Sequence, residues 1–327
     1  MSVAWGILST ARINELVLAG ARKSDRVRMV AVGSRDRARA EAYAREHGLE
    51  RAHGSYQELV DDPAVEAVYV SLPNDGHVEW SIRALRAGKH VLCEKPLTRH
   101  AREAEEAFDV AEQEGRLLME AFMWMHAPQI RRLETLVAEG AIGEVRLIRA
   151  VHTFIADDPL DIRLLTELDG GSLMDVGCYC VHAARHLAGE PERVQAEAVR
   201  NGNGVDVRFA ATTFHPGGVV AQLTSGLDIP EIHELEVVGS SGSLFLDDPW
   251  HGWVVPRIRI RDVEGNEDEI RLEPTDPYQL ELENLSAAIR GEAKPLLGRS
   301  DAVAQATALE ALFRSAESGD RVGVPAS

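Results

Sequence analysis

The sequence predicts an α/β protein with an N-terminal Rossmann dinucleotide-binding domain, residues 1–121, and a C-terminal α/β domain with an open, mostly antiparallel sheet, residues 122–327. The first observation is an alternation of short apolar runs and polar helical segments up to residue 121, which is typical of a parallel sheet with helical crossovers. The second is a succession of alternating runs, with few helices between them, over the remaining residues, which favours antiparallel strands. The third is the length of 327 residues, which is enough for two cores.

The composition excludes several classes of protein. Hydrophobic residues make up 45% of the chain and charged residues 27%, as in ordinary soluble proteins. A net charge of -18 argues against nucleic acids and membrane surfaces as partners. Cys93, Cys178 and Cys180 are too few for a disulfide framework, and we see no signal-peptide pattern or membrane-spanning apolar run. We therefore expect a cytoplasmic protein.

In the first domain, each predicted strand is followed by a turn and a helix. Because the carboxyl ends of parallel strands meet at one edge, the residues that follow them should lie along the crevice where such sheets bind ligands. The expected strands are 3–8, 27–34, 65–72, 89–93 and 116–121, and the expected helices are 10–22, 56–60, 77–87 and 101–114. The residues placed at the crevice are Ser9, Arg35, Pro73, Asn74, Glu94, Lys95 and Glu120.

The first turn takes the place of a dinucleotide-binding G-x-G-x-x-G motif that begins at Gly6, with Leu8 and Ala11 at the second and third glycine positions. A helix that starts there would direct free N–H groups and the positive end of its dipole at a pyrophosphate. Ser9 and Thr10 would either contact the cofactor or cap the helix. The glycine pattern is weak alone, and its place between a strand and a helix strengthens it.

The end of the second strand favours NADP over NAD. NAD-binding proteins usually carry there an acidic residue that bonds the ribose hydroxyls. This chain has Ser34 and Arg35 instead, and a guanidinium suits a 2′-phosphate. Alternatively, Arg35 is one of several solvated arginines, and the nearby Asp36 leaves NAD possible.

The stretch 91–98 places Lys95 at the end of a buried strand, before Pro96. A lysine at that position points into the crevice, although a surface lysine would show the same pattern. His77 could face a ligand, but we favour a helix-start histidine without catalytic weight. The residues expected to bind the cofactor here are Ser71, Pro73, Asn74, His77, Glu94 and Lys95.

The second domain begins with a helix at 128–139, and strands dominate after it. The expected strands are 145–154, 194–199, 205–214, 219–225, 232–238, 243–246 and 257–260. Helices near 170–188 and 278–290 should cover one face of this sheet. The other face is a candidate interface for a homodimer or homotetramer, because large apolar sheet faces rarely stay exposed.

The segment from Asp169 to Cys180 holds the candidate catalytic pair of this domain. Asp175 and Tyr179 are four residues apart, so on a helix they would share a face and could meet one small substrate. An ammonium such as that of Lys95 would lower the pKa of the phenol from its usual value near 10. Alternatively, the tyrosine is a half-buried packing residue and the aspartate complements the helix dipole.

A metal site on this segment is not expected. On a helix, Cys178 and Cys180 would point about 200° apart. His182 and His186 share a face, but they lack the glutamate of a metalloprotease helix.

Glu94-Lys95-Pro96, taken together with the glycine-rich run from Gly170 to Tyr179, resembles the Gfo/Idh/MocA family of oxidoreductases. The resemblance extends over nearly the whole chain, including 119–124 and 161–163. It implies a Rossmann domain, a second domain that often builds dimers or tetramers, and functional roles for Lys95 and Asp175.

Tyr179 resembles the tyrosine-type branch of that family, which includes dihydrodiol dehydrogenase, NADP-dependent xylose dehydrogenase, glucose–fructose oxidoreductase and sugar 3-ketoreductases. There the tyrosine is the proposed acid/base. Arg163 resembles an arginine near the nicotinamide end of the cofactor, and Trp124 lies where members line the nicotinamide or substrate pocket.

The resulting hypothesis is an NAD(P)-dependent oxidoreductase, with NADP favoured, that acts on a secondary alcohol or carbonyl of a sugar-like substrate. Tyr179 would be the acid/base and Lys95 its charge partner, while Asp175 orients Lys95 or a hydroxyl. The competing hypotheses are a non-catalytic NADP sensor and an NAD-dependent glycosidase. An aldose, a keto-sugar nucleotide and an aromatic dihydrodiol all remain open as substrates.

Overall fold

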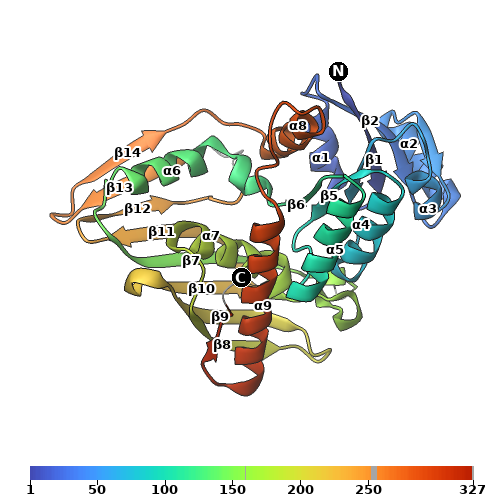
Figure 1. The fold of residues 1–327 in the computed structure, drawn as a ribbon. Helices are drawn as coiled ribbons and strands as arrows, with labels where there is room; N and C mark the ends of the chain where they lie inside the picture. The colour runs from blue at the N-terminus through green and yellow to red at the C-terminus, as the bar shows by residue number, and fades with distance from the viewer. Residues whose placement is uncertain (159, 252–255, 326–327) are drawn as a thin grey trace. The chain divides into compact units, whose positions relative to one another are not determined.

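The computed structural model describes residues 1–158, 160–251 and 256–325, and the chain forms two compact units (Figure 1). The first unit comprises Met1–Thr98, Arg102–Met123 and Asp276–Ala302. The second comprises Arg99–Ala101, Trp124–Thr275 and Val303–Ser327.

The first unit is built on a six-stranded parallel sheet in the order β3-β2-β1-β4-β5-β6. This is the doubly wound order of dinucleotide-binding domains, so the predicted Rossmann fold is confirmed. The order reverses between β1 and β4, and ligands bind at such a switch point. The strands are β1 (Val3–Leu8), β2 (Val27–Gly33), β3 (Arg51–His53), β4 (Ala67–Val70), β5 (His90–Glu94) and β6 (Leu118–Ala121).

The central strands carry apolar side chains on both faces because helices cover both faces of a parallel sheet. All residues of β1 and β4 are buried, and Trp5 and Tyr69 are among the largest fully buried side chains. The three-residue edge strand β3 lacks such a run, and the sequence did not reveal it. The helices are α1 (Asn14–Ala21), α2 (Arg37–His47), α3 (Tyr56–Val60), α4 (His77–Arg86), α5 (Ala101–Gln113) and α8 (Pro277–Ile289).

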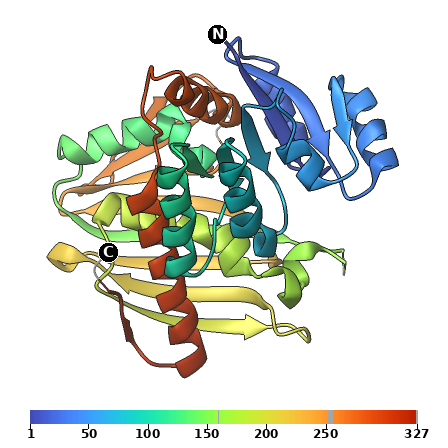
Figure 2. The same cartoon turned by 45° about the vertical axis from the view of Figure 1, so that its right-hand side comes forward.

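We expected a helix near residues 278–290 to cover the second sheet, but helix α8 does not. It belongs to the first unit, where it packs against α1 and β2 (Figures 1 and 2). Gly20 permits this contact, because a Cβ there would lie 2.7 Å from the backbone nitrogen of Gln279. The apolar positions of α8 indicate burial, but they do not specify which sheet the helix packs on.

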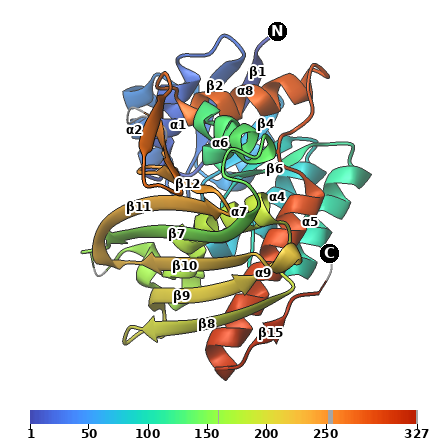
Figure 3. The ribbon, with the colours of Figure 1, turned by 90° about the vertical axis from the view of Figure 1, so that its left-hand side faces the viewer.

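The second unit contains a nine-stranded sheet in the order β14-β13-β12-β11-β7-β10-β9-β8-β15 (Figure 3). Among the described strand pairs, β7 and β10 are parallel and the others are antiparallel, as predicted. The strands are β7 (Val145–Ile155), β8 (Arg193–Arg200), β9 (Asp206–Phe214), β10 (Val220–Gly226), β11 (Asp228–Gly239), β12 (Gly242–Leu246), β13 (Arg257–Asp262), β14 (Glu267–Arg271) and β15 (Val322–Gly323).

In the described part of this unit, helices lie on one face of the sheet, and the other face is turned toward the viewer in Figure 3. The covering helices are α6 (Pro128–Ala138), α7 (Cys178–Ala188) and, from residue 303, α9 (Arg299–Ser318), which the sequence analysis did not identify. Exposed side chains of the open face include Arg149, Gln195, Glu197, Arg208, Gln222 and Glu234. The same face also exposes the apolar side chains of Ile155, Val199 and Ile232, so it is mixed in character. Within the described residues, no helix has the length and apolarity needed to cross a bilayer.

Candidate active site

The turn after β1 begins at Ser9, and this corrects the position of the predicted glycine motif. Gly6 lies inside β1, where a Cβ would meet Leu59 at 2.9 Å, so it serves packing against α3 and not the turn. Ser9 has a φ of 123°, a conformation that favours glycine. The motif spacing therefore falls on Ser9, Ala11 and Asn14, three residues later than expected.

Side chains of this turn fix its shape. The Ser9 hydroxyl accepts a hydrogen bond from the Ala11 N–H at 3.1 Å and donates to the Ser71 carbonyl at 2.9 Å. The fully buried Asn14 side chain donates to the Ser9 carbonyl at 3.0 Å. Helix α1 starts at Asn14 and has no side-chain cap, so neither Ser9 nor Thr10 caps it.

The turn suits an anion. Within the described residues, the N–H groups of Thr10, Arg12 and Ile13 donate no hydrogen bond. Unsatisfied N–H groups before a helix attract phosphate oxygens. The turn thus offers donors for a pyrophosphate although it contains no glycine.

The end of β2 carries a free cation beside an aspartate that is already engaged. Asp36 caps α2 by accepting a hydrogen bond from the Arg39 N–H at 3.2 Å. Ser34 is buried, and its hydroxyl accepts from the Asp36 N–H at 3.3 Å. In the described part of the chain, the exposed Arg35 side chain makes no hydrogen bond or ion pair. Arg35 can therefore meet an anionic group.

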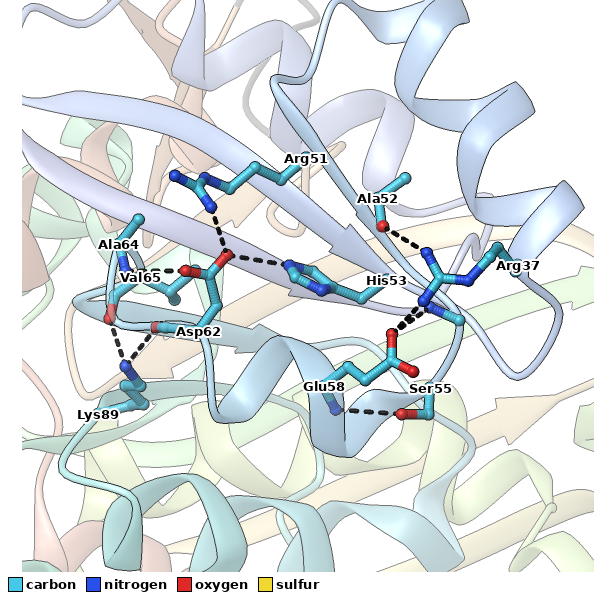
Figure 4. A network of polar contacts seen from close by, with 11 residues as sticks. Arg37, Arg51, Ala52, His53, Ser55, Glu58, Asp62, Ala64, Val65 and Lys89 are labelled. Atoms are coloured by element: carbon cyan, nitrogen blue, oxygen red, sulfur yellow. Dashed lines mark hydrogen bonds and ion pairs between the residues drawn. The ribbon is translucent and has the colours of Figure 1, made fainter.

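The neighbouring Arg37 is committed to the protein itself, as Figure 4 shows. Its guanidinium forms an ion pair of 2.6 Å with Glu58, which also accepts from the Gly54 N–H at 3.0 Å. The same network holds Lys89, whose ammonium donates to the carbonyls of Asp62 and Val65 at 2.7 Å each. Among the arginines of this strand end, Arg37 is thus structural.

Lys95 lies half-buried directly after β5, at the crevice edge of the first unit, as predicted. The peptide bond between Lys95 and Pro96 is cis. Next to it, Glu94 accepts a hydrogen bond from the hydroxyl of the buried Tyr69. Lys95 therefore has a carboxylate neighbour that is itself held in place.

His77 is a buried positioning residue. Its Nδ1 lies 2.8 Å from the Pro96 carbonyl and its Nε2 lies 2.9 Å from the Leu72 carbonyl, so it joins the segments that follow β4 and β5. Burial lowers the pKa of His77 to about 4, and the charge of Lys95 acts in the same direction. The residue is 1% exposed, and its expected contact with the cofactor stays a prediction. Pro73 and Asn74 are partly exposed at the end of β4.

In the second unit, the glycines before α7 allow close packing. A Cβ on Gly170 would lie 2.5 Å from the Arg163 carbonyl, and one on Gly171 would lie 2.2 Å from Asp206 Oδ1. The buried Asp206 accepts hydrogen bonds from the Ser172 hydroxyl and the Leu173 N–H, each at 2.8 Å. The Gly-Gly-Ser-Leu run therefore anchors the start of this helical segment to β9.

Asp175 pairs with Arg163. The Arg163 Nε donates to Asp175 Oδ2 at 2.7 Å, and its Nη1 lies 3.2 Å from both oxygens of Asp161. Asp175, followed by burial and Asp161, shifts the pKa of Arg163, and the net effect is a raised value. Asp175 lies in a π-helical turn, Leu173–Gly177, so the four-residue spacing to Tyr179 does not by itself place both on one face.

Tyr179 is 7% exposed and lies among aromatic rings. Its ring centroid is 5.2 Å from that of His152 and 5.8 Å from that of Trp250. Trp124 is 1% exposed, and its ring centroid lies 5.4 Å from that of Trp250 and 5.6 Å from that of His182. Trp124 therefore belongs to the same cluster of aromatic rings as Tyr179, which it joins through Trp250.

The three cysteines are free thiols. As expected for a helix, the Sγ of Cys178 lies 3.5 Å from the Asp175 carbonyl, and that of Cys180 lies 3.7 Å from the Thr224 carbonyl on β10. His186 pairs with Glu134.

Several residues that support the site carry no signal in the sequence. Asn14, Asp206 and the buried Glu281 are polar side chains within segments that otherwise resemble ordinary helix or strand positions. Nothing in the sequence pairs Asp206 with the glycines, because the contact joins residues 34 or more apart.

Comparison with known proteins gives concordant matches. The description "Oxidoreductase family, NAD-binding Rossmann fold" matches residues 4–122, and "GFO/IDH/MocA C-terminal domain" matches residues 130–245. A D-xylose 1-dehydrogenase (NADP+) of Haloferax volcanii is 36% identical over 97% of this chain and 98% of that protein. A dTDP-3,4-didehydro-2,6-dideoxy-α-D-glucose 3-reductase of Streptomyces violaceoruber is 38% identical over 73% of this chain and 71% of that protein. A solved 3-ketoreductase from Actinomadura kijaniata, in complex with NADP and TDP-benzene, has a TM-score of 0.91 at 32% identity over 96% of this chain and 98% of that one.

Proposed function

The chain belongs to the GFO/IDH/MocA family of NAD(P)-dependent oxidoreductases, and from this premise we propose that it acts on a secondary alcohol or carbonyl of a sugar-like substrate with NADP as the cofactor. The observation that carries the proposal is the coexistence of an anion-binding turn at Ser9, a free cation at Arg35 and a tyrosine within an aromatic cluster. When bound, the nicotinamide supplies or accepts the hydride.

The proposed cofactor contacts follow the crevice edge of the first unit. The free N–H groups of Thr10, Arg12 and Ile13, on either side of Ala11, would bind the pyrophosphate, and Ser34 with Arg35 would bind the 2′-phosphate. The engagement of Asp36 with α2 supports NADP, since that carboxylate already accepts a helix N–H. Relatives named for NADP+ or solved with NADP support the same choice. The further proposed contacts are Ser9, Ser71, Pro73, Asn74, Glu94, Lys95, Trp124 and Arg163.

We propose that Tyr179 exchanges the proton of the reacting hydroxyl. Its phenol donates this proton when a carbonyl is reduced, and its phenolate accepts the proton when an alcohol is oxidised. Lys95 is the proposed charge partner, which stabilises negative charge on the phenol oxygen and on the reacting oxygen. Asp175 orients Arg163 in this scheme, because the two are joined at 2.7 Å.

The substrate class follows from the names of the relatives. They include enzymes for D-xylose, a dTDP-linked keto-sugar and trans-1,2-dihydrobenzene-1,2-diol. All three have two adjacent ring carbons that each carry a hydroxyl or a carbonyl oxygen. We therefore propose a cyclic vicinal diol, or an oxidised form of it with one or two carbonyls, as the reacting unit.

A turnover screen tests this function. Purified protein would receive NADP+ with aldoses and dihydrodiols, or NADPH with keto-sugars and dicarbonyls, with NAD forms in parallel. We expect turnover with the phosphorylated cofactor and a loss in kcat of about 100-fold or more for Tyr179→Phe and Lys95→Met. Tyr56→Phe, on α3, is the control for losing a phenol hydroxyl. Unchanged turnover in Tyr179→Phe, with NADPH binding intact, would remove Tyr179 from the mechanism.

Two other outcomes identify the competing functions. Tight NADPH binding without turnover across the panel would indicate the non-catalytic sensor. NAD retained through purification, with glycoside cleavage and no net redox change, would indicate the glycosidase.

We also propose that copies of this chain associate through the open face of the second sheet, which exposes Ile155, Val199 and Ile232 among charged side chains. Light scattering after gel filtration tests it. A dimer or tetramer that dissociates in Gln222→Trp would support the interface, and a monomeric wild type would contradict it.

A further inference from the structure

A group of metal-ligating side chains lies in the second unit, away from the cysteines and histidines that the sequence suggested. His233 comes from β11, while Asp248 and His251 follow β12. One ligand atom of each lies within 4.8 Å of the others. The Nδ1 atoms of His233 and His251 lie 3.6 and 3.0 Å from the same Asp248 oxygen, Oδ1. We propose that His233, Asp248 and His251 bind one divalent transition-metal ion of the zinc class.

The spacing of the donor atoms fits such an ion. Zinc bonds to imidazole nitrogen and carboxylate oxygen are about 2.0–2.2 Å long, so tetrahedral ligand atoms lie about 3.4 Å apart. The two distances to Asp248 Oδ1, 3.0 and 3.6 Å, lie on either side of this separation. Small rotations of the side chains around a central ion would equalise them.

The chemistry of the donors selects the ion. Two imidazoles and one carboxylate favour Zn²⁺, Co²⁺, Ni²⁺ or Cu²⁺ over Mg²⁺ and Ca²⁺, which prefer oxygen ligands. Three protein ligands leave a fourth position for water or a small molecule. The Nε2 of His233 lies 3.6 Å from the exposed Glu231, which adds a second negative charge near the proposed ion.

The segment that carries Asp248 and His251 is held independently of an ion. The buried Gln129 side chain donates to the carbonyls of Asp248 and Pro249 at 3.1 and 3.2 Å. The fully buried Trp250 donates from Nε1 to the Val151 carbonyl at 3.1 Å. These bonds preorganise the donors, so little conformational entropy is lost when an ion binds.

The three proposed ligands are mostly shielded from solvent, which strengthens their electrostatic attraction for a cation. The side chains of His233, Asp248 and His251 are 12%, 17% and 25% exposed. His152 packs against His233, with ring centroids 4.7 Å apart, and against Tyr179. A bound ion would therefore fix the segment around Trp250, one ring away from Tyr179. The inference concerns metal binding alone and does not depend on the proposed reaction.

Metal titration of untagged, chelator-treated full-length protein tests the site. Calorimetry with Zn²⁺ should give one ion per chain with a Kd of about 1 μM or tighter. Co²⁺ should give visible absorption bands of a four-coordinate nitrogen–oxygen site. Asp248→Ala and His251→Ala should each weaken binding by about 100-fold or more. His186→Ala removes a half-buried histidine of the same unit and should bind Zn²⁺ as the wild type does.

Several outcomes would overturn the inference. Wild-type protein that binds no stoichiometric Zn²⁺ lacks the site, and equal binding in Asp248→Ala and wild type places the ion elsewhere. Should either alanine variant fail to fold by circular dichroism, His233→Gln serves in its place, with its cobalt spectrum as the readout. A His233→Gln spectrum identical to that of the wild type would contradict the assignment.

Discussion

The Ser9 hydroxyl lies 2.9 Å from the Ser71 hydroxyl, and this contact joins the ends of β1 and β4. The Ser71 hydroxyl in turn donates to the Leu8 carbonyl at 3.2 Å. These strands flank the point where the strand order of the parallel sheet reverses, which is where such sheets bind ligands. The serine pair thus holds the turn in the shape that leaves its N–H groups free.

Ser9 therefore combines a favourable hydroxyl with an unfavourable backbone angle, and two variants separate these effects. Both Ser9→Ala and Ser9→Gly lose the hydroxyl, but glycine accepts a φ of 123° without strain. We expect Ser9→Gly to be more stable than Ser9→Ala by about 1 kcal/mol or more in guanidinium unfolding. If Ser9→Ala proved equally stable, the angle would carry no cost there.

Cofactor choice should depend on Arg35. Arg35→Ala removes a cation with no partner in the described part of the chain, so protein stability should change little. We expect the Kd for NADP+ to rise by about 10-fold or more, with little change for NAD+, because only NADP+ carries the 2′-phosphate. Fluorescence titration measures both constants.

Arg39→Ala is the control for this prediction, since Arg39 is exposed on the same helix start. A similar loss of NADP+ affinity in both variants would indicate general electrostatic attraction and not a specific contact. Equal weakening of NAD+ and NADP+ in Arg35→Ala would contradict the assignment of Arg35 to the 2′-phosphate.

Gly171 should tolerate no side chain. Its φ is 134°, and a Cβ would lie 2.2 Å from the buried Asp206 carboxylate, which holds Ser172 and Leu173. Gly171→Ala should cost about 3 kcal/mol or more, from backbone strain and displaced hydrogen bonds. Gly189→Ala is matched to it, because Gly189 has a φ of 80° and no atom near its Cβ position. Similar unfolding free energies for the two variants would contradict the role of Asp206.

The pattern of the sequence predicted the elements well wherever burial imposes a period. The buried strands β1, β4 and β5 and the alternating strands β7 to β11 lie close to the predicted ranges, because each must place apolar side chains on covered faces. The position of Lys95 was also predicted, because it directly follows a buried strand in the sequence. The same reasoning could not find β3, because it has three residues and only one of them, Ala52, is apolar.

What the pattern could not supply are contacts between distant residues. Gly6 looked like a turn residue, yet packing against Leu59 places it within β1. The pairing of Asp175 with Arg163, and of Gly171 with Asp206, depends on tertiary packing. The group of His233, Asp248 and His251 likewise comes from two segments with no shared spacing. The periodicity of a segment predicts which of its faces is buried, but it does not predict which other segment packs against that face.

Acid should destabilise the protein through buried histidines. Burial, with Arg116 second, lowers the pKa of His90 to about 4, and burial, with Arg131 second, lowers that of His126 to about 3. As the pH falls below about 6.5, the unfolded chain takes up protons that the folded chain does not. Each histidine should therefore remove about 1.4 kcal/mol of stability per pH unit until its folded pKa is reached.

Urea unfolding between pH 7.5 and 5 measures this slope, and His90→Asn tests its source. The Nδ1 of His90 accepts from the Leu117 N–H at 3.0 Å, and an asparagine oxygen can accept the same bond without titrating. The variant should lose about 1.4 kcal/mol per pH unit of the slope while keeping stability at pH 7.5. An unchanged slope would show that other groups carry the acid sensitivity.

Glu281 should have the opposite dependence on pH. This carboxyl is 1% exposed on α8, and burial, with the charge of Glu94 second, raises its pKa well above the usual value. Its Oε1 has no hydrogen-bond partner among the described residues. Above the ordinary pKa near 4.5, the unfolded chain loses a proton that the folded chain retains, so stability falls as the pH rises.

Glu281→Gln replaces this neutral carboxyl with a group of the same size that cannot ionise. We expect the variant to gain stability relative to wild type as the pH rises from 5.5 to 8, by up to about 1.4 kcal/mol per pH unit. Urea unfolding across that range measures the difference. Glu283→Gln removes a carboxylate from the same helix and provides the comparison. A difference in unfolding free energy between Glu281→Gln and wild type that stays constant at every pH would show that Glu281 is ionised in the folded protein. Glu281 would then need a cationic partner within α8 or the strands that α8 covers.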